Sequence, residues 1–113
     1  MSTLRVNTIQ DAAGTGQASA GQLGVGQTWQ NVTSSRTGAT SYQNTTGRPI
    51  EVAIITAGVG SSAAVQVSVN NSTWIDVGIT SGTIGMANQF TVPNNWYYRT
   101  SGAVTLVNWS ELR

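Results

Sequence analysis

Few side chains in this 113-residue sequence could carry out acid–base or nucleophilic chemistry. The sequence has no histidine, cysteine or lysine, which excludes the usual zinc sites, thiol nucleophiles, Schiff bases and serine–histidine–aspartate triads. Its four acidic residues lie far apart: Asp11, Glu51, Asp76 and Glu111. Paired carboxylates can cleave glycosides, but this spacing favours structural pairing with arginine. We therefore expect no enzymatic activity, no cofactor and no metal site.

A short segment that mixes aromatic rings with polar side chains, residues 94–99, is the best candidate for a binding site. In a strand, Trp96 and Tyr98 point to one side, and Tyr97 and Arg99 point to the other. Aromatic faces stack on sugar rings, and neighbouring amides and hydroxyls suit neutral glycans. The residues predicted to bind glycan are Asn94, Asn95, Trp96, Tyr97 and Arg99.

Two structural explanations compete with this binding hypothesis. Tryptophan usually belongs to the core, which applies to all four tryptophans: Trp29, Trp74, Trp96 and Trp109. The alternative for Tyr97 is packing at an interface between subunits. The face that carries Tyr97 and Arg99 is the one we expect to be exposed, because it carries the charge.

The elements that must position these residues are strands. Val, Ile, Thr, Tyr and Trp make up 42 residues, whereas Leu, Glu and Lys make up 6. The 13 glycines recur at short intervals, as turn residues do. No segment shows a helical apolar period. The composition therefore predicts an all-β protein with a single jelly-roll-like β-sandwich of short strands.

Alternating apolar residues place the individual strands. Both faces of the clearest strand, residues 50–56, look covered, and residues 70–72 read as a hairpin turn. Ser101 and Gly102 read as a two-residue hairpin loop that pairs the strands on either side of them. The predicted strands are 27–33, 40–45, 50–56, 63–70, 73–77, 89–92, 95–100 and 103–110.

The first 26 residues differ in composition from the rest, so we divide the chain into residues 1–26 and 27–113. Leu4, Val6 and Ile9 lie in a strand-like segment, and residues 11–26 are almost all small or polar. Such a stretch buries too little apolar area to offset its ordering entropy. It is either a flexible linker or an attachment arm that adds a strand to a partner protein. The strand-like tip favours the arm.

Charge and hydropathy exclude two kinds of partner. A net charge of +1 from scattered arginines provides no basic stripe for nucleic acid. No apolar run approaches the roughly 20 residues that span a bilayer, so we expect no membrane insertion. The N-terminus also lacks the apolar stretch of a signal peptide.

Four segments carry a resemblance to a known group of proteins: STLRVNTIQDAAG (residues 2–14), GQTWQNVTSSR (26–36), YQNTTGRPI (42–50) and VNWSELR (107–113). The last three resemble the C-terminal β-domain of tailed-bacteriophage tail fibres and related virion proteins. The first is similar to the N-terminal segment of small phage fibre proteins. The resemblance implies an all-β domain, a homotrimer and a place on the virion surface, and it implies no catalytic residues.

These observations lead to one favoured function and two alternatives. The favoured function is a structural virion protein, assembled in the host cytoplasm, that serves as a short tail fibre or fibre tip. Its N-terminal arm would dock to other virion proteins, and its sandwich would bind a host-surface glycan. The alternatives are a capsid decoration or head-fibre protein, and a free lectin-like carbohydrate-binding module.

Overall fold

A computed structural model describes residues 8–10, 17–19 and 22–113 of the chain. These residues form strands and one short 3-10 turn, η1 (Thr33–Ser35). The strands are β1 (Thr8–Gln10), β2 (Gln17–Ser19), β3 (Trp29–Asn31), β4 (Tyr42–Gln43), β5 (Ile50–Gly60), β6 (Ala64–Ser68), β7 (Ile75–Ile79), β8 (Met86–Val92), β9 (Tyr97–Thr100) and β10 (Val104–Leu112).

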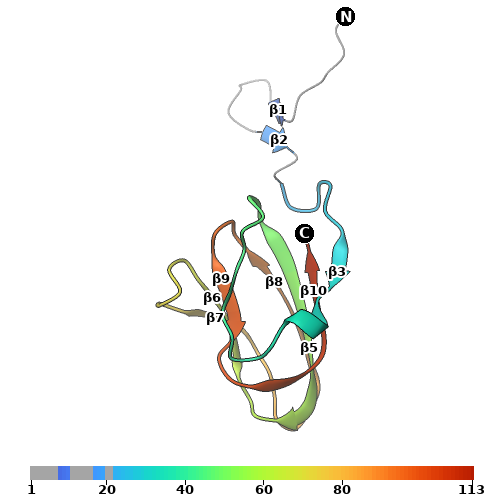
Figure 1. Cartoon of the computed structure of the whole chain (residues 1–113), viewed down its shortest axis with the longest axis vertical. Coiled ribbons are helices and arrows are strands. Elements are labelled where there is room, and N and C mark those ends of the chain that lie inside the picture. The colour runs from blue at the N-terminus through green and yellow to red at the C-terminus, as the bar shows by residue number, and fades with distance from the viewer. Residues whose placement is uncertain (1–7, 11–16, 20–21) are drawn as a thin grey trace, which may run out of the picture.

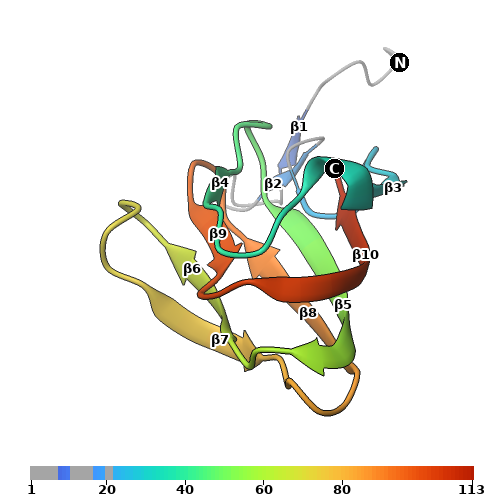
Figure 2. The same cartoon turned by 60° about the horizontal axis from the view of Figure 1, so that its bottom comes forward.

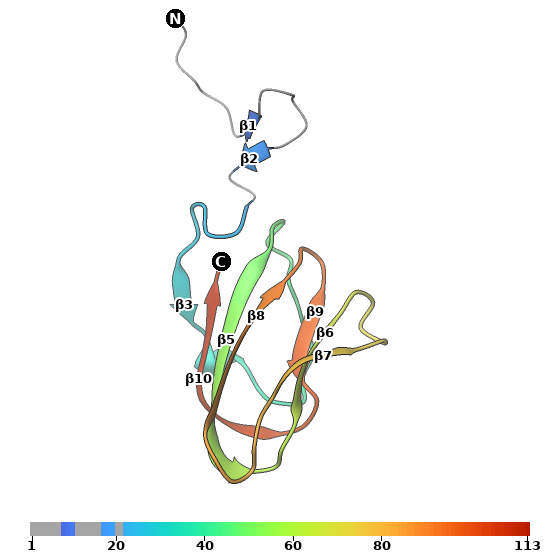
Figure 3. The same cartoon turned by 180° about the vertical axis from the view of Figure 1, so that it is seen from behind.

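Two four-stranded antiparallel sheets pack face to face, as Figures 1 and 3 show from opposite sides. Their strand orders are β3-β10-β5-β8 and β4-β9-β6-β7. The pairs are nested: β3 pairs with β10, β4 with β9, β5 with β8 and β6 with β7. The prediction of an all-β sandwich is confirmed.

The core lies between the sheets, and β5 shows how it is built. Ile50, Val52 and Ile54 alternate along the strand and are fully buried. The prediction that both faces of this strand are covered is wrong, because Ile55 on the other face is 40% exposed and Ala53 is only half-buried. A two-layer sandwich covers one face of each antiparallel sheet and leaves the other to solvent.

One of the two predicted hairpins forms. β6 and β7 pair in an antiparallel register, and their hairpin projects from the side of the sandwich (Figures 1 and 2). The turn depends on local side-chain bonds, since the Asn70 Oδ1 accepts hydrogen bonds from the amides of Ser72 and Thr73. Asn71 takes the left-handed conformation with φ 62°, which asparagine tolerates well.

The prediction of a hairpin across Ser101 and Gly102 is wrong. β9 pairs with β4 and β6, whereas β10 pairs with β3 and β5 in the opposite sheet. The short connection therefore crosses from one layer to the other. Alternation alone cannot distinguish a hairpin from such a crossing, because both give each strand one face that points into the core.

The side chain of Asn88 links the edges of the two sheets where β7 lies beside β8. Its Nδ2 donates to the carbonyl of Ile79 at 2.8 Å, and its Oδ1 accepts from the Ile79 amide at 3.2 Å. The side chain thus occupies the position of a strand partner for Ile79. Gly78 makes room for it, because a Cβ at that position would lie 2.2 Å from the Asn88 Oδ1.

This arrangement predicts energetic coupling between Gly78 and Asn88. Gly78→Ala should lower the free energy of unfolding by about 1–3 kcal/mol through overpacking, and Asn88→Ala by about 1–3 kcal/mol through lost hydrogen bonds. The double variant should lose less than the sum, because the clash is gone. Urea titrations measure the cycle, with Gly102→Ala as the matched control, since its Cβ would have ordinary contact at 3.7 Å. Strict additivity would contradict the coupling.

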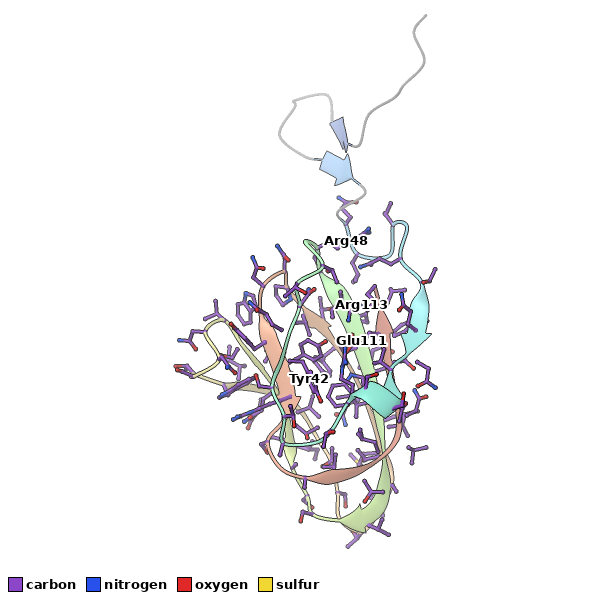
Figure 4. The ribbon with its side chains drawn as sticks, in the orientation of Figure 1. Tyr42, Arg48, Glu111 and Arg113 are labelled. Atoms are coloured by element: carbon purple, nitrogen blue, oxygen red, sulfur yellow. The ribbon has the colours of Figure 1, made fainter. Side chains whose placement is uncertain are left out.

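The N-terminal part of the described chain meets the sandwich through Arg48. Its Nη2 donates to the carbonyl of Gln22 at 2.6 Å and also to the carbonyl of Val25, and the Gln27 Nε2 donates to the carbonyl of Pro49. Arg48 lies at this end of the sandwich in Figure 4. The β1–β2 pair lies beyond the same end (Figures 1 and 3).

The residues predicted to form the tip of the arm are only partly covered by this description. Leu4 and Val6 lie outside the described residues. Ile9 lies in β1, where it pairs with Ala18 of β2.

Candidate functional site

The outer face of the β4-β9-β6-β7 sheet brings together polar and aromatic groups that could bind a ligand. Alternation in β9 buries Tyr98 and Thr100 and turns Tyr97 and Arg99 outward, where both are half-buried. The same rule in β6 buries Val65 and turns Gln66 outward.

The strand register lines up three polar side chains across this face. Gln66 pairs with Arg99 on one side and with Asp76 on the other. The Arg99 Nε donates to the Gln66 Oε1 at 3.0 Å, and the Gln66 Nε2 donates to the Asp76 Oδ1 at 2.8 Å. We call Arg99, Gln66 and Asp76 the polar ladder. It presents a cation at one end and a carboxylate at the other.

Trp74 covers the cationic end of the polar ladder. The Cζ of Arg99 lies 3.9 Å from the centroid of the Trp74 ring, which is a cation–π contact. Stacking and the bond to Gln66 hold the guanidinium in one orientation. The result is an aromatic ring, a fixed cation, an amide and a carboxylate on one solvent-facing surface, and these groups suit hydroxyl-rich ligands.

The predicted glycan-binding residues are distributed over different environments. Tyr97 and Arg99 are on the outer face as expected, with Tyr97 paired to Gln43 of β4. Trp96 is half-buried against the core.

The two predicted asparagines are exposed residues of the turn that precedes β9. The Asn94 Oδ1 accepts from the Gly47 amide. Asn95 takes φ 70°, and its carbonyl accepts from the Gln43 Nε2. The side chain of Asn94 and the backbone of Asn95 therefore hold this turn in place.

Sequence reasoning missed Trp74, Gln66 and Asp76 as members of the site. The alternation of β6 and the turn at residues 70–72 placed Gln66 and Asp76 on paired strands. No local signal paired β6 with β9, because Gln66 and Arg99 are 33 residues apart. The cation–π contact follows only from that long-range pairing.

A second polar cluster is buried between the sheets around Glu111, which is 0% exposed. Its Oε2 accepts hydrogen bonds from the Arg36 Nε at 3.0 Å, the Tyr98 hydroxyl at 2.8 Å and the Trp109 Nε1 at 3.0 Å. Its Oε1 accepts from the Arg36 Nη2 and the Arg113 Nη1. Figure 4 shows Glu111 among its neighbours.

The hydrogen bonds around Glu111 decide its charge state. Burial alone would raise the pKa of this carboxyl group, but the bonds from Arg36 and Tyr98 outweigh it and hold the pKa below its ordinary value. Burial and the neighbouring carboxylate raise the pKa of Tyr98. The carboxylate is thus ionised and fully hydrogen-bonded, an arrangement that joins the two sheets rather than one that accepts a substrate proton.

Within residues 8–10, 17–19 and 22–113, no acidic side chains cluster in a way that could hold a metal ion. The same part of the chain contains no helix long and apolar enough to cross a membrane.

Comparisons with protein-family models, with curated proteins and with solved structures found no match to this chain.

Proposed function

We propose that this chain is a structural protein of a tailed-bacteriophage virion, a short tail fibre or fibre tip, that binds a host-surface glycan. The observation that carries the glycan proposal is the polar ladder with Trp74 stacked on its cationic end. Stacking on an aromatic ring supplies affinity for a sugar, and fixed hydrogen-bonding groups beside it supply specificity.

The strand order supports a jelly roll. Four nested strand pairs, from β3 with β10 to β6 with β7, correspond to one long hairpin wound into two sheets. Jelly rolls are common among viral capsid and lectin domains. A jelly roll is therefore compatible with both a structural role in the virion and glycan binding, although fold alone assigns neither role.

Exposed apolar side chains support the proposal of a homotrimer. Ile75, Val77 and Ile79 of edge strand β7 are 52%, 44% and 61% exposed. Apolar side chains gathered on an edge strand are a common feature of subunit contacts. Light scattering tests the trimer, and a monomer mass that does not change with concentration would reject it.

The attachment arm is proposed to dock to other virion proteins. Arg48 donates a hydrogen bond to the carbonyl of Gln22 and so anchors the segment that begins at Gln22 to the sandwich. Removal of residues 1–21 therefore leaves this anchored segment intact. The truncated chain should melt near the wild-type temperature and be lost from purified particles. Locating the full chain on intact particles separates a tail position from a capsid position, and absence from particles would favour a free lectin.

The glycan proposal predicts a specific effect of Trp74. Against a panel of purified bacterial surface polysaccharides, Trp74→Ala should weaken binding by about 10- to 100-fold, the usual effect of losing one aromatic anchor. Trp29→Ala is the matched control, because Trp29 is 50% exposed on the edge of the other sheet. Equal binding by both variants, with folding intact, would remove this face as the site.

A further inference from the structure

Arg99 differs from the other described arginines in what its guanidinium contacts. Arg36 and Arg113 form ion pairs with Glu111, and Arg48 donates to backbone carbonyls. Among the described residues, no carboxylate lies within ion-pair distance of Arg99, and only its Nε has a hydrogen-bond partner. Its two terminal nitrogens are therefore available as donors on a half-buried, solvent-facing surface.

Gln66 stands between this cation and the carboxylate at the other end of the polar ladder. Asp76 lies two strands from Arg99 in the sheet, and it accepts its hydrogen bond from the intervening Gln66. The Gln66 amide bonds both side chains, at 3.0 Å to Arg99 and 2.8 Å to Asp76, and the two charged groups form no ion pair with each other. Gln66 thus acts as a spacer that leaves the terminal nitrogens of Arg99 without a carboxylate partner among the described residues.

The guanidinium is also oriented before any ligand arrives. The Cζ of Arg99 lies over the Trp74 ring, 3.9 Å from its centroid, and the bond to Gln66 fixes the Nε edge. The terminal nitrogens of a planar, fixed guanidinium form a fork that matches a carboxylate in geometry and charge. Little side-chain entropy remains to be lost when an anion binds.

We infer that the glycan bound by this face is acidic and that a sugar carboxylate pairs with the terminal nitrogens of Arg99. This inference rests on the proposed glycan-binding function. It replaces the neutral glycan expected from the sequence with a uronic-acid-type ligand. Asp76, exposed at the other end of the polar ladder, would accept hydrogen bonds from sugar hydroxyls.

The test uses the full chain and polysaccharides of defined charge. The probes are alginate, polygalacturonate and hyaluronate as uronates, dextran and mannan as neutral polymers, and teichoic acid as a phosphate polymer. Calorimetry should detect binding to at least one uronate, and reduction of its carboxyl groups to alcohols should weaken binding at least about tenfold. Binding should also weaken as salt rises.

Two variants test the geometry of the proposed pair. Arg99→Gln should weaken uronate binding by about 10- to 100-fold. Arg99→Lys keeps the charge but not the fork, so it should recover only part of the affinity. Trp29→Ala should bind as the wild type does, and melting curves confirm that each variant is folded.

The alternative outcomes separate the inference from the function on which it rests. If only neutral polymers bind, and Trp74→Ala weakens that binding, the glycan function stands and the acidic ligand is rejected. Equal binding of teichoic acid and uronates would reject the carboxylate as the recognised group. If no polysaccharide binds, both the inference and the proposed glycan function fail.

Discussion

Replacing Glu111 with glutamine is expected to lower the free energy of unfolding by about 3–5 kcal/mol, the usual cost of removing one partner from a buried ion pair. Glutamine has the same shape, but it leaves Arg36 and Arg113 without a counter-charge. Its amide nitrogen would also face groups that donate. Domains of this kind have a total stability of about 5–15 kcal/mol, so the loss should be evident in urea titration.

Glu51→Gln provides the matched control. Glu51 makes one side-chain hydrogen bond at the solvent-facing surface, accepted from the Thr91 hydroxyl, so its replacement should cost less than about 1 kcal/mol. Tyr98→Phe removes one of the five hydrogen bonds donated to Glu111 and should cost about 1.5–3 kcal/mol, the usual contribution of a hydrogen bond to a charged group. If Glu111→Gln were no more harmful than Glu51→Gln, the buried network would have no role in stability.

The same carboxylate should set part of the acid sensitivity of the fold. The pKa of Glu111 is lower in the folded protein than its ordinary value of 4.5. Its contribution to stability is therefore complete above that ordinary value and declines as pH falls through the folded pKa. The difference in stability between the wild type and Glu111→Gln should shrink as the pH is lowered below about 4.5.

The strands were predictable from the sequence where one face meets the core and the other meets solvent. β5 and β6 follow this rule, and their buried residues are Ile50, Val52, Ile54, Val65 and Val67. Which strands become neighbours was harder to predict, because the same alternation fits a hairpin within one sheet or a connection that crosses to the other sheet. The wrong pairing of β9 with β10 arose from that ambiguity.

The burial of two polar side chains, Glu111 and Asn44, was not predictable for a different reason. Glu111 occupies an inward position of β10, where the pattern predicts an apolar residue, and its main partner Arg36 is 75 residues away. Asn44 similarly fell within the predicted strand 40–45, whereas β4 ends at Gln43 and Asn44 is a buried residue just after it. A polar residue can be buried only when distant partners satisfy it, and no local pattern reports those partners.

Asn44 is 1% exposed and joins two loops through its side chain. Its Nδ2 donates to the carbonyls of Arg48, Val92 and Pro93, at 2.7, 3.0 and 3.2 Å. Its Oδ1 accepts from the amide and the hydroxyl of Thr46. These contacts hold the 44–48 loop against the turn that leads into β9, and therefore support the position of the strand that carries Arg99.

Asn44→Asp is expected to lower the free energy of unfolding by about 3–5 kcal/mol, because it buries a carboxylate oxygen against three carbonyl oxygens and removes their donor. The oxygen that accepts from Thr46 is kept, so the loss reports the missing donor together with the buried carboxylate that replaces it. Asn94→Asp is the matched control, since the exposed Asn94 accepts a single bond from Gly47 that aspartate can also accept. It should change stability by less than about 0.5 kcal/mol. Urea titration of both variants makes the comparison, and equal stability would mean that Asn44 does not hold these loops together.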